Sequence, residues 1–161
     1  MKRALAISIL LILGGCASIA PEQIAPSDLL LDQVEGKSNV RVSGSNEQII
    51  KNEDLKLAVE SAILSSQLFS GMGRNLNVSV SVLSIKNPMF GMDLTAEARV
   101  RWQIFNADSK EEIFNSVFSS SHTSTVGDHV VAVQRMKMAN QEALRKNIEM
   151  ALKAISKDLT K

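Results

Sequence analysis

The sequence predicts an α+β fold: an antiparallel sheet of three or four strands with two helices packed on one face, in the order βαβββα. Three observations lead to this prediction. Apolar and polar residues alternate over long segments between residues 76 and 125, as expected of strands with one buried face. Residues 130–155 instead repeat their apolar side chains with the helical period. A shorter helical pattern, preceded by a short alternating segment, lies on the N-terminal side.

The first strand is predicted at residues 40–43, which alternate and are followed by a glycine. The sequence leaves open whether this strand is inserted into the sheet or added at an edge. Asn52 is expected to cap a helix that runs to about residue 66, because the two acidic residues that follow it would then lie in the first turn, where the helix dipole favours carboxylates.

Three longer strands are predicted at residues 76–85, 94–104 and 113–125. Short connections with turn residues at 87–91 and 106–109 join them, which indicates an antiparallel meander. The alternation of the first of these strands changes parity after Val82, so we expect a β-bulge near that residue. The second strand alternates most clearly and places Trp102 on the inward face, under the helices.

The last helix, residues 130–155, is predicted to bury one broad apolar face that begins with Val133 and to expose an opposite face that begins with Arg135. Asn140 and Asn147 fall inside the apolar face. Buried amides need hydrogen-bond partners, so we expect both to bond to backbone of the sheet or of the 71–75 connection and to fix the helix register. The alternative is a polar spot on an interface.

The N-terminus has the pattern of a secretory signal. Lys2 and Arg3 precede an apolar run of about ten residues, which fits a signal-peptide core and is too short to span a bilayer. The run ends in Leu13-Gly14-Gly15-Cys16.

Residues 1–16 resemble the signal and lipobox of bacterial lipoproteins, in which Leu, a small residue and Gly or Ala precede an invariant Cys. The resemblance implies cleavage before Cys16, a thioether-linked diacylglycerol on its sulfur and a third acyl chain on its new amino group. Several acyl chains anchor a protein stably to a membrane. Ala17 and Ser18 follow, not the Asp that resembles an inner-membrane retention signal, which implies the periplasmic face of the outer membrane. The alternative is a cleavable signal with an incidental Cys.

The predicted organisation is a signal peptide at 1–15, the lipidated Cys16 with a tether at 16–38, and a single α+β domain at 39–161. The tether is broken by proline and glycine and shows no sustained period. It is either a mobile linker or docks on the domain through a helical turn at residues 28–32. Cys16 is the only cysteine, so packing alone must stabilise the domain.

Phe90-Gly91-Met92-Asp93-Leu94, Trp102 and residues 139–148 carry a second resemblance, together with the βαβββα order behind a lipobox. The domain resembles small envelope lipoproteins of Gram-negative bacteria, which include the lipopolysaccharide-assembly lipoprotein and auxiliary lipoproteins of lipid-transport ABC systems. Some members of a similar set are labelled UDP-N-acetylglucosamine acyltransferase. Acyltransferases of that name resemble hexapeptide-repeat β-helices, and no hexapeptide period occurs here.

Two groups of residues are candidates for an interaction site. Met89, Phe90 and Met92 crowd one turn, where they either form an apolar tip that binds a partner or lipid, or fold back under the helices. Arg99 and Arg101 share the outward face of their strand, which is either a solvated surface or a site for an anionic ligand or partner.

His122, Asp128 and His129 lie close together in the sequence, but a solvated role is the simpler interpretation, and we expect no metal site and no cofactor. No catalytic motif is found, and no free cysteine remains after lipidation, so we expect a protein that is not an enzyme. Removal of Lys2 and Arg3 with the signal leaves 16 of the 18 basic residues against 17 acidic ones, a balance without the basic excess typical of nucleic-acid binding.

We therefore expect a membrane-anchored periplasmic accessory lipoprotein that binds another envelope component, most simply a protein, through its exposed sheet face or edge, in an assembly, transport or scaffold role. One alternative is a lipid or glycolipid carrier, which needs a cavity between the sheet and the helices. A remote alternative is an acyltransferase-type enzyme, which needs a polar cleft.

Overall fold

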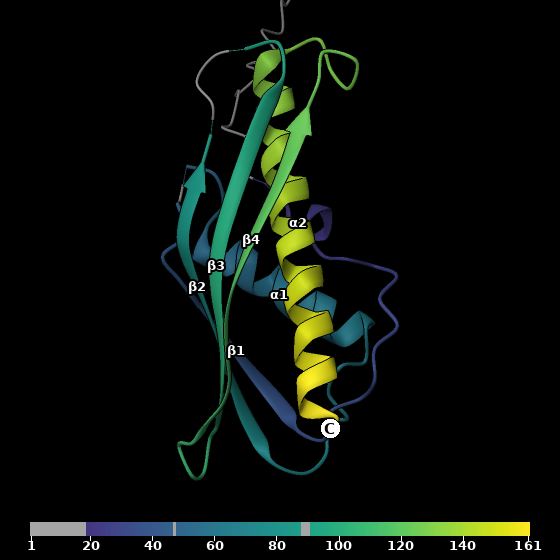
Figure 1. Ribbon diagram of the computed structural model, residues 1–161, viewed down its shortest axis with the longest axis vertical. Coiled ribbons are helices and arrows are strands. Elements are labelled where there is room, and N and C mark those ends of the chain that lie inside the picture. Colours follow the sequence, from purple (N-terminus) through teal and green to yellow (C-terminus); the bar gives the residue numbers. More distant parts are fainter. Residues whose placement is uncertain (1–18, 47, 88–90) are drawn as a thin grey trace, which may run out of the picture.

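The computed structural model describes residues 19–46, 48–87 and 91–161. Every predicted strand and helix is present in the predicted order (Figure 1), so the α+β class is confirmed. A short 3-10 helix precedes them. The elements are η1 (Pro21–Gln23), β1 (Lys37–Ser43), α1 (Asn52–Ser65), β2 (Asn75–Lys86), β3 (Leu94–Asn106), β4 (Glu112–Ser124) and α2 (Ala132–Leu159).

The four strands form one sheet in the order β1-β2-β3-β4. The pairs β2–β3 and β3–β4 are antiparallel, as the predicted meander requires. β1 lies at the edge and pairs with β2 in the parallel direction, so the sheet is mixed and not wholly antiparallel. The reason is the crossover: α1 carries the chain back to the end of the sheet at which β1 begins, and strands joined by such a helix run parallel.

A register shift between Val82 and Ser84 confirms the predicted bulge in β2. Val82 points inward and is 6% exposed, whereas Leu83 is 44% exposed. The inserted residue reverses the parity of the alternation. After the bulge, Ser84 therefore pairs with the outward Arg99 of β3, and Ile85 pairs with the inward Ala98. The change of parity in the sequence thus records a real irregularity of the sheet.

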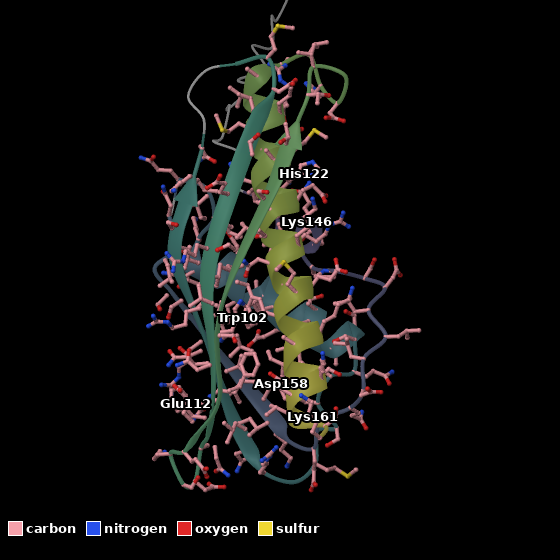
Figure 2. The ribbon with its side chains drawn as sticks, viewed as in Figure 1. Trp102, Glu112, His122, Lys146, Asp158 and Lys161 are labelled. Carbon is pink, nitrogen blue, oxygen red and sulfur yellow. The ribbon has the colours of Figure 1, made fainter. Side chains whose placement is uncertain are left out.

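Both helices cover the same face of the sheet. α2 runs lengthwise along β3 and β4, while α1 lies against β1 (Figure 1). In the part of the chain that the structure describes, the opposite face carries no helix. Figure 2 shows Trp102 on the helix side of the sheet and Glu112 on the other side. The inward side chains of β3 are at most 2% exposed: Leu94, Ala96, Ala98, Val100, Trp102 and Ile104.

The described part of the predicted tether is packed against the domain. Its buried apolar residues recur every fifth position: Ile19, Ile24, Leu29 and Val34. The backbone of Val34 also pairs with the segment after α1, donating to the Leu68 carbonyl at 2.7 Å and accepting from the Ser70 N–H at 3.0 Å. The segment docks, but not through the predicted helical turn at residues 28–32, which have irregular structure.

A buried hydrogen-bond network ties α2 to the strands beneath it. Trp102 Nε1 donates to Asn147 Oδ1 at 3.1 Å, and Asn147 Nδ2 donates to the Phe118 carbonyl at 2.9 Å. Ser120 Oγ donates to the Ala143 carbonyl of α2 at 2.7 Å. The prediction that Asn147 bonds to the sheet backbone is confirmed, and both the oxygen and the nitrogen of its side-chain amide have hydrogen-bond partners.

The same prediction is wrong for Asn140. Its Nδ2 donates to the Met136 carbonyl of its own helix at 2.9 Å, and its buried Oδ1 has no partner among the described residues. The amide lies one heptad before Asn147, beyond the part of α2 that faces Trp102. Asn140 therefore contributes nothing to the register of α2 on the sheet.

These two asparagines give a matched pair for a stability measurement. Asn147→Ala should leave the buried indole N–H of Trp102 unpaired and destabilise the domain by about 1–3 kcal/mol. Asn140→Ala should be neutral or slightly stabilising, because it removes an unpaired buried acceptor and improves helix propensity. Urea unfolding followed by circular dichroism checks the prediction. Equal losses in the two variants would contradict the role given to the network.

Docking of the N-terminal segment is testable in the same way. Ile24 is fully buried and Leu30, six residues later, is 99% exposed. Ile24→Ala should cost about 2–5 kcal/mol, as large-to-small core substitutions do, and Leu30→Ala should change stability by less than about 0.5 kcal/mol. Thermal melts of both variants decide the matter. An unchanged melting temperature in Ile24→Ala would mean that the segment is a linker.

Candidate interaction surfaces

The sheet face without helices, called here the open face, consists of the outward side chains of β1–β4. Most of these side chains are small and polar: serine, threonine and asparagine from all four strands. Across this face Ser43 and Ser81 share a hydrogen bond at 3.3 Å, and Thr95 and Thr123 share one at 2.7 Å. The short side chains leave the longer basic ones standing above the surface.

The open face carries an excess of positive charge. Its two carboxylates are both engaged: Glu97 lies 3.9 Å from Lys86 Nζ, and Glu112 accepts a hydrogen bond from Gln103 at 2.7 Å. Five basic residues of the four strands stand against these two acids: Lys37, Arg41, Lys86, Arg99 and Arg101. Because the whole sequence has a formal net charge of only +1, this excess is a local property of the face.

Arg99 and Arg101 lie where the sequence places them, on the outward face of β3 and exposed. Ser84 and Ser119 flank Arg99 on the neighbouring strands, while a serine of β2 and Val117 flank Arg101. Among the described residues, no carboxylate lies within 4.0 Å of either guanidinium. Both are therefore available to a planar anionic group, which a guanidinium binds in a bidentate manner.

Two shallow depressions hollow the open face. One, of about 500 Å³, lies beside Arg99 and Lys86 near the bulge. The other, of about 510 Å³, is lined by Arg41, Phe105 and Lys110. Each depression carries two cations, and Glu97 also lines the first one, where it faces Lys86. The arginine side chains of the two depressions can bind carboxylates or phosphates.

Arg41 is a member of this surface that sequence reasoning did not single out. Alternation in residues 40–43 already places it opposite two inward valines. Its partners depend on the parallel pairing with β2, which brings Arg41 level with Ser79 and Gln103. From the usual spacing between strands and the rise per residue, the Cα atoms of Arg41 and Arg101 are about 12 Å apart along the face. Local sequence contains no signal for that pairing.

The candidate turn is only partly described. Met89 and Phe90 lie outside the described residues, as does Cys16. Met92 is described and is 75% exposed. It lies at the end of the sheet just before β3, and not on the open face, so the structure does not bring it together with Arg99 and Arg101.

The beginning of α2 differs from the prediction in two residues. Val133, predicted to be buried, is 75% exposed, and Arg135, predicted to be exposed, is 6% exposed. Val133 lies in the first turn of α2, where it lines an open surface depression with Ile19 and Met136 and stays exposed. Arg135 instead turns inward and its Nη1 donates to the carbonyls of His129 at 2.7 Å and Val130 at 2.9 Å.

His122, Asp128 and His129 have other partners. Asp128 accepts hydrogen bonds from the backbone N–H and the hydroxyl of Thr125 at 2.7 and 3.0 Å, and these bonds lower the pKa of its carboxyl group. His129 Nδ1 accepts a backbone N–H, and His122 lies 3.4 Å from Lys146 Nζ (Figure 2). Over the described ranges, no three metal-ligating side chains are grouped.

Comparison with known proteins identifies similar folds. A Xanthomonas campestris protein of the family DUF330 superposes with a TM-score of 0.55 at 10% identity, over 88% of this chain and 92% of its own. A predicted lipoprotein of Caulobacter crescentus CB15 gives 0.56 at 12% identity, over 76% and 90%. A minor lipoprotein of Acinetobacter baumannii gives 0.51 at 12% identity, over 79% and 93%.

These identities are low, so the comparisons establish the fold: this chain has a fold that bacterial lipoproteins also adopt. No protein-family model matches the chain, and no curated protein matches it in sequence. Among the helices that the structure describes, none combines the length and the apolar character needed to cross a bilayer.

Proposed function

We propose that this protein is a non-catalytic, lipid-anchored accessory protein of the bacterial envelope that binds an acidic surface of another envelope protein through the open face. The observation that carries the proposal is the set of three exposed arginines on that face, Arg41, Arg99 and Arg101, for which no carboxylate partner exists among the described residues. An assembly, transport or scaffold role fits such a binding surface.

The chemistry of the face favours a protein partner with grouped carboxylates. Arginine at a protein–protein interface is enriched among the residues that contribute most to binding, and its fork geometry matches carboxylates. The flat, serine-rich surroundings permit close approach of a second surface. Electrostatic attraction between the basic face and an acidic partner also accelerates encounter.

The lipid anchor is supported by the resemblance of residues 1–16 to a lipobox and by the fold, which lipoproteins share. Ala17 and Ser18 after Cys16 favour the outer membrane, with the domain on the periplasmic side. The resemblance to lipopolysaccharide-assembly and lipid-transport auxiliary lipoproteins agrees with a role in a multi-component envelope machine.

The carrier alternative receives less support. A carried lipid would need a cavity between the sheet and the helices, but the inward residues of β3 are at most 2% exposed to a water-sized sphere. The facing residues of α2, such as Ala143, Ile148 and Leu152, are equally buried. The layer that would hold an acyl chain is filled by side chains.

The open face can be tested by crosslinked pull-down of the lipidated protein from membranes, followed by mass spectrometry. The double variant Arg99→Ser, Arg101→Ser should recover at least about tenfold less partner, a loss of about 1.4 kcal/mol or more. The control, Lys153→Ser with Lys157→Ser, removes two positive charges from α2 and should recover as much partner as the wild type. Both variants should keep the wild-type melting temperature, because all four side chains are exposed. Unchanged recovery in the arginine variant would refute the proposed face.

The anchor is tested by Cys16→Ser. This change should abolish palmitate labelling and leave an unprocessed or mislocalised chain, because serine cannot form the thioether. The wild type should fractionate with outer-membrane markers on a sucrose gradient. Labelling that persists in Cys16→Ser would exclude the lipobox, while co-fractionation of the wild type with inner-membrane markers would exclude the outer membrane.

A further inference from the structure

One end of the elongated domain exposes a group of large apolar side chains, called here the apolar end. Two segments contribute to it: residues 91–93, just before β3, and the connection between β4 and α2, which meet because Leu94 pairs with Ser124. Figure 1 shows both segments at the same end as the start of α2. The members are Met92, Val126, Val130, Val131 and Val133, between 40% and 79% exposed.

Hydrogen bonds hold the connection between β4 and α2 in a defined conformation. Asp128 closes the turn after β4 through its two hydrogen bonds to Thr125. The buried Arg135 then fixes the backbone of His129 and Val130 by its two bonds to their carbonyls. Val126, Val130 and Val131 of this connection are exposed. An exposed apolar group of this kind on an ordered segment indicates a contact surface.

The N-terminal chain reaches the domain at this same end. Ile19, the first described residue, is 3% exposed and lines one depression with Val133 and Met136 of α2. Only two residues separate Ile19 from Cys16. Three extended residues span at most about 11 Å. A lipid on Cys16 therefore holds the bilayer surface within about 11 Å of Ile19, which lies beside Val133 of the apolar end.

We propose that the apolar end rests in the interface of the bilayer that receives the lipids of Cys16, so that the long axis of the domain stands away from the membrane. The proposal depends on the lipid anchor of the proposed function. Valine and methionine side chains enter the boundary between headgroups and acyl chains by the hydrophobic effect. Asp93 and Asp128 lie at the same end, so the contact does not require anionic lipids. The open face is then presented sideways, free of the membrane.

The experiment uses the lipidated full chain in phosphatidylcholine vesicles. Because the thioether consumes the only cysteine thiol, a new cysteine can be labelled selectively with the environment-sensitive fluorophore NBD. Val130→Cys and Met92→Cys probe the apolar end from its two segments. Met72→Cys is the matched control, since Met72 is an apolar residue of similar exposure, 70%, before β2 at the opposite end.

NBD at residues 130 and 92 should show emission at shorter wavelength on reconstitution and be quenched several-fold by doxyl-labelled lipid, while NBD at residue 72 should show neither change.

Flotation of the vesicles reports anchoring independently of the label. If the chains float but all three positions respond alike, the membrane contact is refuted and the anchor stands. If the chains do not float, the anchor fails and the inference fails with it. Shielding of residue 130 in native membranes but not in protein-free vesicles would assign the apolar end to a protein partner instead and overturn the inference.

Discussion

The hydrogen bonds of Asn147 and Ser120 fix α2 on the sheet, and the two surfaces of interest depend on that position. They join α2 to the central strand β3 through Trp102 and to the edge strand β4 through the Phe118 carbonyl. Apolar side chains alone would allow a helix to shift along an apolar sheet. A buried amide, in contrast, finds all of its hydrogen-bond partners at only one position of the helix on the sheet. With α2 held there, one sheet face is covered, the other is open, and the first turn of α2 lies at the apolar end.

The pattern of apolar and polar residues predicted those parts of the fold that depend on residues close together in the sequence. Alternation identified β2, β3 and β4, and its change of parity identified the bulge after Val82. The direction of β1 was not predictable in the same way, because pairing with β2 joins residues 38 positions apart, such as Val40 and Val78. The expected cap of α1 was also displaced: Asn52 is the first helical residue, and its side chain accepts from Ser45 in the preceding loop.

The docked N-terminal segment and the start of α2 show two further limits. The buried residues Ile19 to Val34 recur every fifth position, a spacing that matches neither the helical period nor the strand period. The sequence pattern therefore did not predict that this segment packs against the domain. In α2 the helical period correctly groups residues on faces, but it does not tell whether another layer covers a given face. Val133 is exposed for this reason, whereas Arg135 is buried because its guanidinium turns to the carbonyls of His129 and Val130. The outward position of Arg99 and Arg101 followed from alternation, whereas the addition of Arg41 required the sheet topology.

The packed N-terminal segment has a consequence for the reach of the protein. α2 has 28 residues, so it is about 42 Å long, and it runs along the longest dimension of the domain (Figure 1). A long flexible tether would let an anchored domain search a wide volume, but only two residues separate Cys16 from the packed segment. For a chain anchored at Cys16, encounters are confined to a layer about 50 Å deep on one side of the membrane, the sum of a short link and one domain length. Components held in that same layer meet the domain at a raised effective concentration, so that even modest affinity for the open face produces stable association.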